Sequence, residues 1–266
     1  MNPNRLLISE VAIRRKHTRN DLPHAPRERR PLVEIHHTPR PVPARWYLRV
    51  KRCVDVLVAS LLLIPAVPVI LLAGLLVRLT SRGPAFYVQV RLGLHGRPFR
   101  IFKIRTMIDK CETLTGPRWA IPGDPRITPV GAVLRATHID ELPQLWNVIR
   151  GDMSLIGPRP ERPEIVANLK RDLPDYDDRL AVRPGITGLA QVQLPPDTSV
   201  SSAADKLVLD RAYINRLGPW LDFRLILCTA MKLLGLGPKH CRWLIRDAIP
   251  KGFRPGHHLR RYHRAA

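Results

Sequence analysis

The longest uninterrupted apolar stretch of the chain begins shortly after residue 50. Val56 to Val77 is a run of 22 residues without a charged side chain. As an α-helix this run would reach roughly 33 Å, which is enough to cross the hydrocarbon core of a bilayer. The alternative is a buried core helix, but apolar runs in soluble core helices are usually shorter. The pattern therefore predicts a membrane segment.

Two prolines at the midpoint of this run, Pro65 and Pro68, argue against a simple crossing, because each removes a backbone donor and bends a helix. Basic residues flank the run on both sides: Arg40, Arg45, Arg49, Lys51 and Arg52 before it, and Arg78, Arg82, Arg91 and Arg97 after it. Since basic flanks favour the cytoplasmic side, we expect a re-entrant anchor over residues 46–82 that is broken at the prolines. Asp55 either caps the first turn of this helix or marks the membrane interface.

After the apolar run the pattern becomes mixed, as in a globular domain, and residues 83–236 are assigned to a cytoplasmic catalytic domain. Two strand-like pieces, Ala85–Gln89 and Pro98–Ile104, surround two glycines and predict a β-hairpin. Residues 124–131 contain proline and glycine and are expected to form a loop. The predicted helices cover residues 141–149, 161–171, 203–217 and 220–236.

The last of these helices is rich in leucine with basic residues at intervals. It is expected either to lie in the membrane interface or to face the protein core, and the sequence does not separate the two. Together the elements predict a mostly helical α+β fold: a monotopic membrane protein with a re-entrant helix, interfacial amphipathic helices and a small hairpin.

Charge is unevenly distributed along the chain. The protein has 266 residues and a formal net charge of +22, of which residues 1–52 carry +9 and residues 239–266 carry +7. We expect a disordered, proline-rich basic extension at 1–45, without a signal peptide, and a basic tail at 237–266. Such arms favour a polyanion, either nucleic acid or an anionic membrane, although solvated tails are an equally simple explanation.

Composition excludes some classes of protein. A hydrophobic content of 45% argues against a wholly disordered basic chain. The four cysteines have no CxxC or other ligand spacing, which disfavours a disulfide scaffold or a zinc finger and fits a reducing compartment.

The candidate chemistry lies between residues 89 and 191, where an adjacent acidic pair occurs among basic residues. Asp140 and Glu141 supply the hard oxygens that Mg²⁺ prefers, and two neighbouring carboxylates need a cation to stay ionised. Pro143 predicts that a helix begins near Asp140, so that both acids feel its positive end. The candidate phosphate-binding cations are Arg91, Lys103, Arg105, Arg135, Arg159 and Arg183. Carboxylates, Mg²⁺ and arginines together suit phosphoryl transfer, whereas the acidic pair alone is typical of a surface helix start.

Three ordered motifs resemble those of bacterial sugar transferases of the monotopic phosphoglycosyl transferase superfamily. They are KRCVDVLVASLLLIPAVPVILLAGLLVRLTSRGPAFYVQVRLGLHGRPFRIFKIRTM, DPRITPVGAVLRATHIDELPQLWNVIRGDMSLIGPRP and VRPGITGLAQV. The resemblance covers about residues 51–235. It implies transfer of a sugar 1-phosphate from a nucleotide diphosphate sugar to a polyprenyl phosphate, which starts lipid-linked glycan synthesis at the cytoplasmic face of the inner membrane. The chain resembles the short form, which lacks additional membrane helices.

The same resemblance implies roles for individual residues. Asp140 matches the nucleophile that forms a covalent phosphosugar intermediate, and Glu141 matches the residue near which Mg²⁺ is held. Pro68 matches the break in the family's re-entrant helix, but Val67 replaces the usual serine and Pro65 is additional. The usual Ser-Leu before the dyad is His138-Ile139 here, either a harmless substitution or a substrate contact.

Two other classes of function remain as alternatives. A basic nucleic-acid-binding protein would leave the apolar run unexplained and lacks the known motifs of such proteins, so no nucleic-acid partner is expected. A catalytically inactive membrane scaffold would leave the acidic pair and the arginines without a role. A homo-oligomer is compatible with the sequence.

Overall fold

The computed structural model describes residues 45–113, 116 and 118–256, so the predicted extension over residues 1–44 lies outside the described residues. The helices are α1 (Arg45–Thr80), α2 (Pro129–Ala136), α3 (Gln144–Arg150), α4 (Pro163–Asp172), α5 (Leu189–Gln193), α6 (Val200–Asn215), α7 (Pro219–Leu233) and α8 (Pro238–Cys241). The strands are β1 (Phe86–Leu92), β2 (Pro98–Ile104), β3 (Ser154–Ile156) and β4 (Gly185–Thr187), and 3-10 turns occupy η1 (Leu94–Gly96), η2 (Ile139–Glu141) and η3 (Pro174–Ala181). The predicted mostly helical fold with a small hairpin is confirmed.

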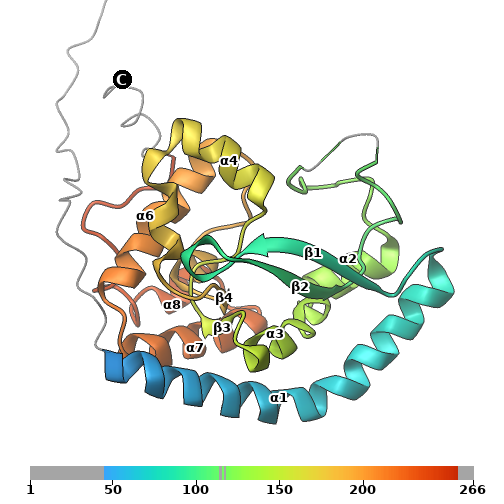
Figure 1. Cartoon of the computed structure of the whole chain (residues 1–266), viewed down its shortest axis with the longest axis horizontal. Coiled ribbons are helices and arrows are strands. Elements are labelled where there is room, and N and C mark those ends of the chain that lie inside the picture. The colour runs from blue at the N-terminus through green and yellow to red at the C-terminus, as the bar shows by residue number, and fades with distance from the viewer. Residues whose placement is uncertain (1–44, 114–115, 117, 257–266) are drawn as a thin grey trace, which may run out of the picture. The chain divides into compact units, whose positions relative to one another are not determined.

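The apolar run forms a single helix, α1, of 36 residues that contains both prolines. Figure 1 shows α1 curving along the other elements, from α7 towards the start of β1. The helix is not interrupted at Pro65 and Pro68, because a proline bend can be absorbed without ending a helix. Asp55 lies ten residues after the helix start at Arg45 and does not cap its first turn.

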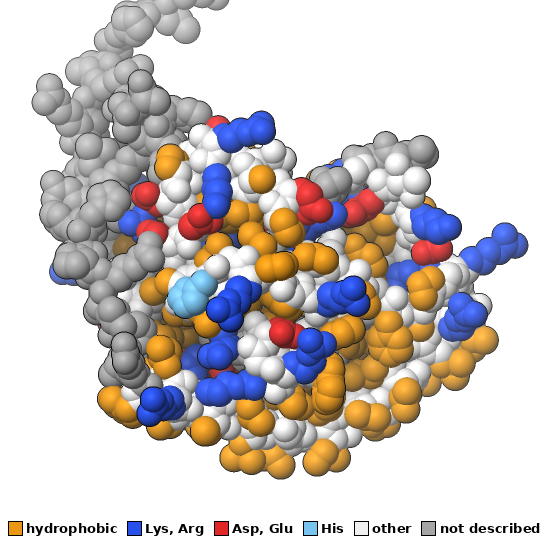
Figure 2. All heavy atoms as spheres, viewed as in Figure 1, with side chains coloured by type: hydrophobic (Ala, Val, Ile, Leu, Met, Phe, Trp, Pro, Cys, Tyr) orange, Lys and Arg blue, Asp and Glu red, His pale blue; other side chains and the backbone are white. Residues whose placement is uncertain are grey.

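The two faces of α1 differ in size and exposure of their side chains. The inner face packs on β2, α2 and α3 through residues that recur every three to seven positions and include three alanines: Ala59, Ala66, Ile70, Ala73 and Val77. The outer face exposes Leu57, Leu61, Leu62, Ile64, Leu71, Leu72, Leu75 and Leu79. Only 22% of its most apolar window is buried, so α1 is not an ordinary core helix. Its length and composition suffice to cross a membrane, and Figure 2 shows hydrophobic side chains along this edge.

The predicted hairpin is present as β1 and β2, which pair antiparallel with Val88 opposite Phe102. The connection between the strands is tight, and His95 adopts a left-handed φ of 55° within it. Ile101 and Ile104 of β2 are buried in the core beneath α1, which also contains residues of α2 and α3. This packing brings β2 beside the acidic pair.

The region around the dyad differs from the sequence-based expectation. The predicted helix over 141–149 is observed as α3, which begins at Gln144 with Pro143 as its N-cap and ends at Arg150 with Gly151, whose φ is 93°, as its C-cap. Asp140 and Glu141 instead lie in the preceding 3-10 turn, η2, so they do not belong to the first turn of α3. Residues 124–128 are loop as expected, but α2 begins at Pro129, behind a Thr128 cap that accepts a hydrogen bond from a backbone N–H.

The remaining predicted helices lie in the carboxyl-terminal half of the chain. The predicted helices 161–171, 203–217 and 220–236 are observed as α4, α6 and α7 with slightly shifted ends. Beyond them, the first part of the expected basic tail contacts α7 through Cys241, and the Gly256 N–H donates to Asp205 of α6. Cys241, Ile245 and Ala248 are buried. Arg224 of α7 holds Asp247 through an ion pair of 2.6 Å.

Candidate active site

The acidic pair occupies a short turn between α2 and α3. His138, immediately before the turn, has a φ of 58°, and its carbonyl accepts a hydrogen bond of 3.2 Å from the Glu141 N–H. A left-handed conformation is uncommon outside glycine and costs free energy unless the surroundings hold it. The backbone therefore changes direction just before Asp140. The turn ends α2 and places both carboxylates against β2.

The Glu141 carboxylate is held by two cations from distant parts of the chain. Lys103 of β2 donates to Oε1 at 2.7 Å, and Arg159 donates to both carboxylate oxygens, with its Nη1 3.3 Å from Oε2. Burial alone would raise the pKa of Glu141, but the charges and hydrogen bonds of Arg159 and Lys103 outweigh it and lower the pKa well below its usual range. Glu141 is therefore ionised at neutral pH.

Asp140 is in the opposite situation. Its residue is only 6% exposed, and its carboxylate makes no hydrogen bond within the described part of the chain. Burial raises the pKa of Asp140, and the charge of Glu141 adds to this, whereas the charges of Lys103, Arg135 and Arg159 lower it. A buried carboxylate with free oxygens and a raised pKa is a frequent mark of a reactive group.

Arg135 lies in the last turn of α2 and is aimed by a neighbouring threonine. Its Nε donates to the Thr106 hydroxyl at 2.8 Å, and no hydrogen bond from its terminal nitrogens is found among the described residues. Burial lowers the pKa of Arg135, partly offset by the charge of Asp140. This leaves a guanidinium fork beside the acidic pair that can bind phosphate oxygens.

Arg159 is positioned by the parallel pair of β3 and β4, which the sequence did not predict. The Gly157 N–H donates to the Thr187 carbonyl at 2.9 Å, directly before the loop that carries Arg159. A side chain on Gly185 would lie 2.1 Å from the Gly157 nitrogen, so this approach requires glycine. The quoted motifs around 157–160 and 183–188 thus meet in space.

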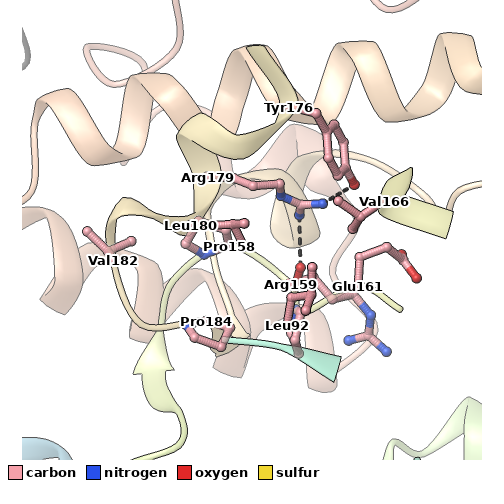
Figure 3. Close-up of a pocket in the computed structure, with 11 residues that line it drawn as sticks. Leu92, Pro158, Arg159, Glu161, Val166, Tyr176, Arg179, Leu180, Val182 and Pro184 are labelled. Carbon is pink, nitrogen blue, oxygen red and sulfur yellow. Dashed lines mark hydrogen bonds between the residues drawn. The ribbon is translucent and has the colours of Figure 1, made fainter. Parts of the chain in front are cut away.

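A buried arginine supports the same loop from the other side. Arg179 of η3 donates to the Arg159 carbonyl at 2.9 Å and to the Tyr176 hydroxyl, as Figure 3 shows. It also forms an ion pair of 2.8 Å with Asp210 of α6. Sequence reasoning missed Arg179, because one arginine among many carries no local signal.

The other candidate cations engage the protein itself. Arg91 pairs with Glu161 at 2.8 Å, next to the Arg159 loop. Arg105 donates to the backbone at residues 81 and 82, and therefore holds the end of α1. Arg183 donates to the Gly151 carbonyl at 3.1 Å, at the far end of α3 from the dyad. The structure thus brings Lys103, Arg135 and Arg159 together with the dyad and gives Arg105 and Arg183 backbone contacts elsewhere.

The acidic pair can contribute to a Mg²⁺ site only as a partial ligand set. Within the described residues there is no group of three or more acidic, histidine or cysteine side chains that could hold a metal. The free carboxylate of Asp140 and the Oε2 of Glu141, which has a single hydrogen bond of 3.3 Å, retain open lone pairs. Because Mg²⁺ often binds one or two carboxylates plus substrate phosphates, these residues fit the ion.

Comparisons with known proteins place the chain in a family. The bacterial sugar transferase family model matches residues 46–235. The chain is 45% identical over 188 residues to a UDP-glucose:undecaprenyl-phosphate glucose-1-phosphate transferase of Caulobacter vibrioides, covering 69% of each chain. It is 40% identical over 199 residues to a UDP-N-acetylgalactosamine-undecaprenyl-phosphate N-acetylgalactosaminephosphotransferase of Aeromonas hydrophila, covering 74% of this chain and 47% of that one.

A third relative has a length closer to the matched region. The chain is 36% identical over 196 residues to the exopolysaccharide production protein PSS of Rhizobium leguminosarum bv. phaseoli, covering 71% of this chain and 98% of that one. Some relatives are longer, and the match spans less than half of the Aeromonas protein. With the matched region extending over α1, the dyad and α7, the chain belongs to the bacterial sugar transferase family.

Proposed function

We propose that this protein is a phosphoglycosyl transferase that moves a sugar 1-phosphate from a UDP-sugar to undecaprenyl phosphate, the first step of a lipid-linked glycan. The observation that carries the proposal is the pair of unlike carboxylates: Asp140 is buried without a hydrogen-bond partner among the described residues, next to a Glu141 held by Lys103 and Arg159. The names of the relatives supply the two substrates.

The reaction divides into two displacements at the same phosphorus. An Asp140 oxygen attacks the phosphorus that carries the sugar; a P–O bond forms to Asp140, and the bond to the departing UMP breaks. A phosphate oxygen of the lipid then attacks this phosphorus, and the bond to Asp140 breaks. The ionised Asp140 carboxylate and the lipid phosphate both attack as anions, so neither displacement requires a base to remove a proton.

The neighbouring residues keep the charges in balance. Lys103 and Arg159 keep Glu141 ionised, and the free fork of Arg135 faces the charge that builds on the phosphate oxygens. When bound through Glu141 and Asp140, Mg²⁺ would neutralise diphosphate charge. The arrangement reduces repulsion between the anionic donor and the Asp140 carboxylate.

The apolar surface supports a membrane anchor of the monotopic kind. The outer face of α1 is exposed and apolar, and α7 adds exposed Trp220, Phe223 and Leu227, as an interfacial helix would. We assign both ends of α1 to the cytoplasmic face of the inner membrane, with a return at Pro65 and Pro68. Cysteines placed at Arg45 and Arg82 should both be shielded from an impermeant thiol reagent in intact cells. Labelling at one end alone would establish a full crossing.

Turnover is the direct test of the function. Purified protein with Mg²⁺ and undecaprenyl phosphate should release UMP from one member of a UDP-sugar panel and form a lipid-linked sugar diphosphate. No release from any UDP-sugar would favour an inactive scaffold. Salt-sensitive retention on DNA without turnover would favour the nucleic-acid alternative.

A further inference from the structure

A lysine near the end of α7 contacts α5 and has no counter-ion among the described residues. Lys232 donates to the Gln191 carbonyl at 2.8 Å and forms no ion pair within the described residues. An ammonium carries three donor protons, so this bond leaves two for another acceptor. The side chain is exposed, so a ligand can reach it.

Short contacts link Lys232 to the loop that positions Arg159. The Gln191 side-chain amide, on the residue that Lys232 contacts, donates to the Gly157 carbonyl at 3.2 Å. One turn earlier on α7, the Thr229 hydroxyl lies 2.8 Å from the Thr187 hydroxyl of β4. These contacts fix α7 against β4, so the position of Lys232 relative to the active-site loop is defined.

The charges that act on Lys232 include those of Arg159 and Glu141. Desolvation by the surrounding chain lowers the pKa of Lys232, and the positive charges of Arg159 and Lys206 lower it further, whereas Glu141 raises it. A position where several cations meet with little compensation attracts an anion.

The residues after Lys232 belong to the apolar surface. Leu233, the last residue of α7, is 59% exposed, and the next residue, Leu234, is 80% exposed; Trp220 and Phe223 of the same helix are exposed as well. Lys232 therefore stands where the apolar surface meets the polar site. A lipid phosphate has this same arrangement, with an anionic head joined to an apolar chain.

Building on the proposed function, we propose that Lys232 binds the phosphate of the polyprenyl phosphate acceptor and orients it for attack on the phosphosugar. Lys103 and Arg159 already hold Glu141, and Arg135 lies beside Asp140, whereas Lys232 has no ion pair among the described residues and is available to the second, membrane-borne phosphate. It acts on the acceptor rather than on the UDP-sugar.

Steady-state kinetics in nanodiscs of neutral phosphatidylcholine separate these roles. Lys232→Met should raise the KM for undecaprenyl phosphate by about tenfold or more, the equivalent of one charged hydrogen bond, and should change the KM for the UDP-sugar by less than about twofold. Lys232→Arg should recover most of the loss. Lys239→Met, which removes an exposed lysine of α8, is the control and should leave both constants unchanged.

The outcomes divide cleanly. An unchanged acceptor KM in Lys232→Met, with an active wild type, would overturn the assignment alone. Equal increases in both KM values, or a lowered melting temperature, would reveal a structural role and overturn it as well. An equal increase of the acceptor KM in Lys239→Met would mean that exposed lysines attract the anionic lipid in general, and would overturn a specific role of Lys232. A wild type that transfers no sugar phosphate would overturn the proposed function together with this assignment.

Discussion

The Asp140–Glu141 turn and the acidic cluster beneath α1, formed by Asp55 and Asp222, both place carboxylates inside the protein. Asp222 accepts hydrogen bonds from the Tyr47 hydroxyl at 2.7 Å, the Lys51 ammonium at 2.7 Å and the Tyr213 hydroxyl at 2.9 Å. The cluster beneath α1 is therefore saturated with donors from α1 and α6, which fix α1 to α7.

Asp55 completes this saturated cluster. It accepts a hydrogen bond of 2.6 Å from the Ser154 hydroxyl and one of 3.3 Å from the Leu155 N–H, which ties α1 to β3. In the dyad only Glu141 is satisfied in this way. The difference teaches that a buried carboxylate whose oxygens all accept hydrogen bonds holds structural elements together. A buried carboxylate without hydrogen-bond donors, such as Asp140, is available for chemistry.

The largest effect is expected at the unsatisfied carboxylate. Asp140→Asn should abolish turnover, by a factor of about 10³ or more, because an amide is not a competent nucleophile. Its melting temperature should not fall, since the change removes a buried charge whose pKa is raised. A marked loss of stability would mean that Asp140 stabilises the fold as Asp222 does, which would contradict the difference between the two carboxylates. Turnover and thermal melting of the same preparation measure both quantities.

The next largest effect is expected at the cation that holds Glu141. Arg159→Ala should cost about 2–4 kcal/mol of transition-state stabilisation, and Arg159→Lys should recover part of it, because an ammonium lacks the planar fork. Arg162→Ala is the matched control, since Arg162 lies three residues away and pairs with Glu112 at 2.7 Å. Comparable losses of kcat/KM in both alanine variants would assign Arg159 to the fold.

In the saturated cluster the effect should move from activity to stability. Asp222→Ala should reduce the free energy of unfolding by about 3 kcal/mol, because it removes the acceptor of the Tyr47 hydroxyl and the close partner of the Lys51 ammonium, which keeps only Asp55 at 3.8 Å. The Tyr213 hydroxyl retains the Ile156 carbonyl at 3.2 Å. Urea unfolding in detergent micelles measures this loss, and kcat per folded molecule should stay near the wild-type value. Loss of kcat without loss of stability would contradict a purely structural role.

The smallest effect is expected at a single hydrogen bond of the same cluster. Ser154→Ala should cost about 1.5 kcal/mol of stability, the range for a bond to a charged group. Asp55 keeps the Leu155 N–H as a donor, so the cluster should survive. A loss of stability as large as that of Asp222→Ala would show that the position of β3 depends on this contact. The Arg159 loop, which follows β3, would then depend on it as well.

The sequence predicted those features that local pattern determines. The run from Val56 to Val77 defined α1 by its hydropathy, the glycines between two β-rich pieces defined the hairpin, and the adjacent acids defined the dyad. The arginines near the acidic pair that were predicted to bind phosphate include Arg135 and Arg159, which the structure places beside the dyad.

Long-range contacts could not be predicted in this way. Arg179 supports Arg159 only because η3 folds back onto the loop, and Arg105 holds the end of α1 only because β2 ends beside it. The three-residue strands β3 and β4 have no periodicity to detect, and the continuity of α1 through Pro65 depends on packing along its whole length. Each of these depends on tertiary structure that residue type alone does not specify.

The central claim is that Asp140 is a covalent nucleophile, and intact-mass measurement tests it most directly. Enzyme incubated with Mg²⁺ and its UDP-sugar, without undecaprenyl phosphate, should gain the mass of one sugar phosphate while releasing one equivalent of UMP. Peptide mapping should place the adduct on Asp140, and Asp140→Asn should show neither adduct nor release. Direct transfer between the two substrates predicts no adduct and no UMP before the lipid is added. An active enzyme that shows neither would contradict the account.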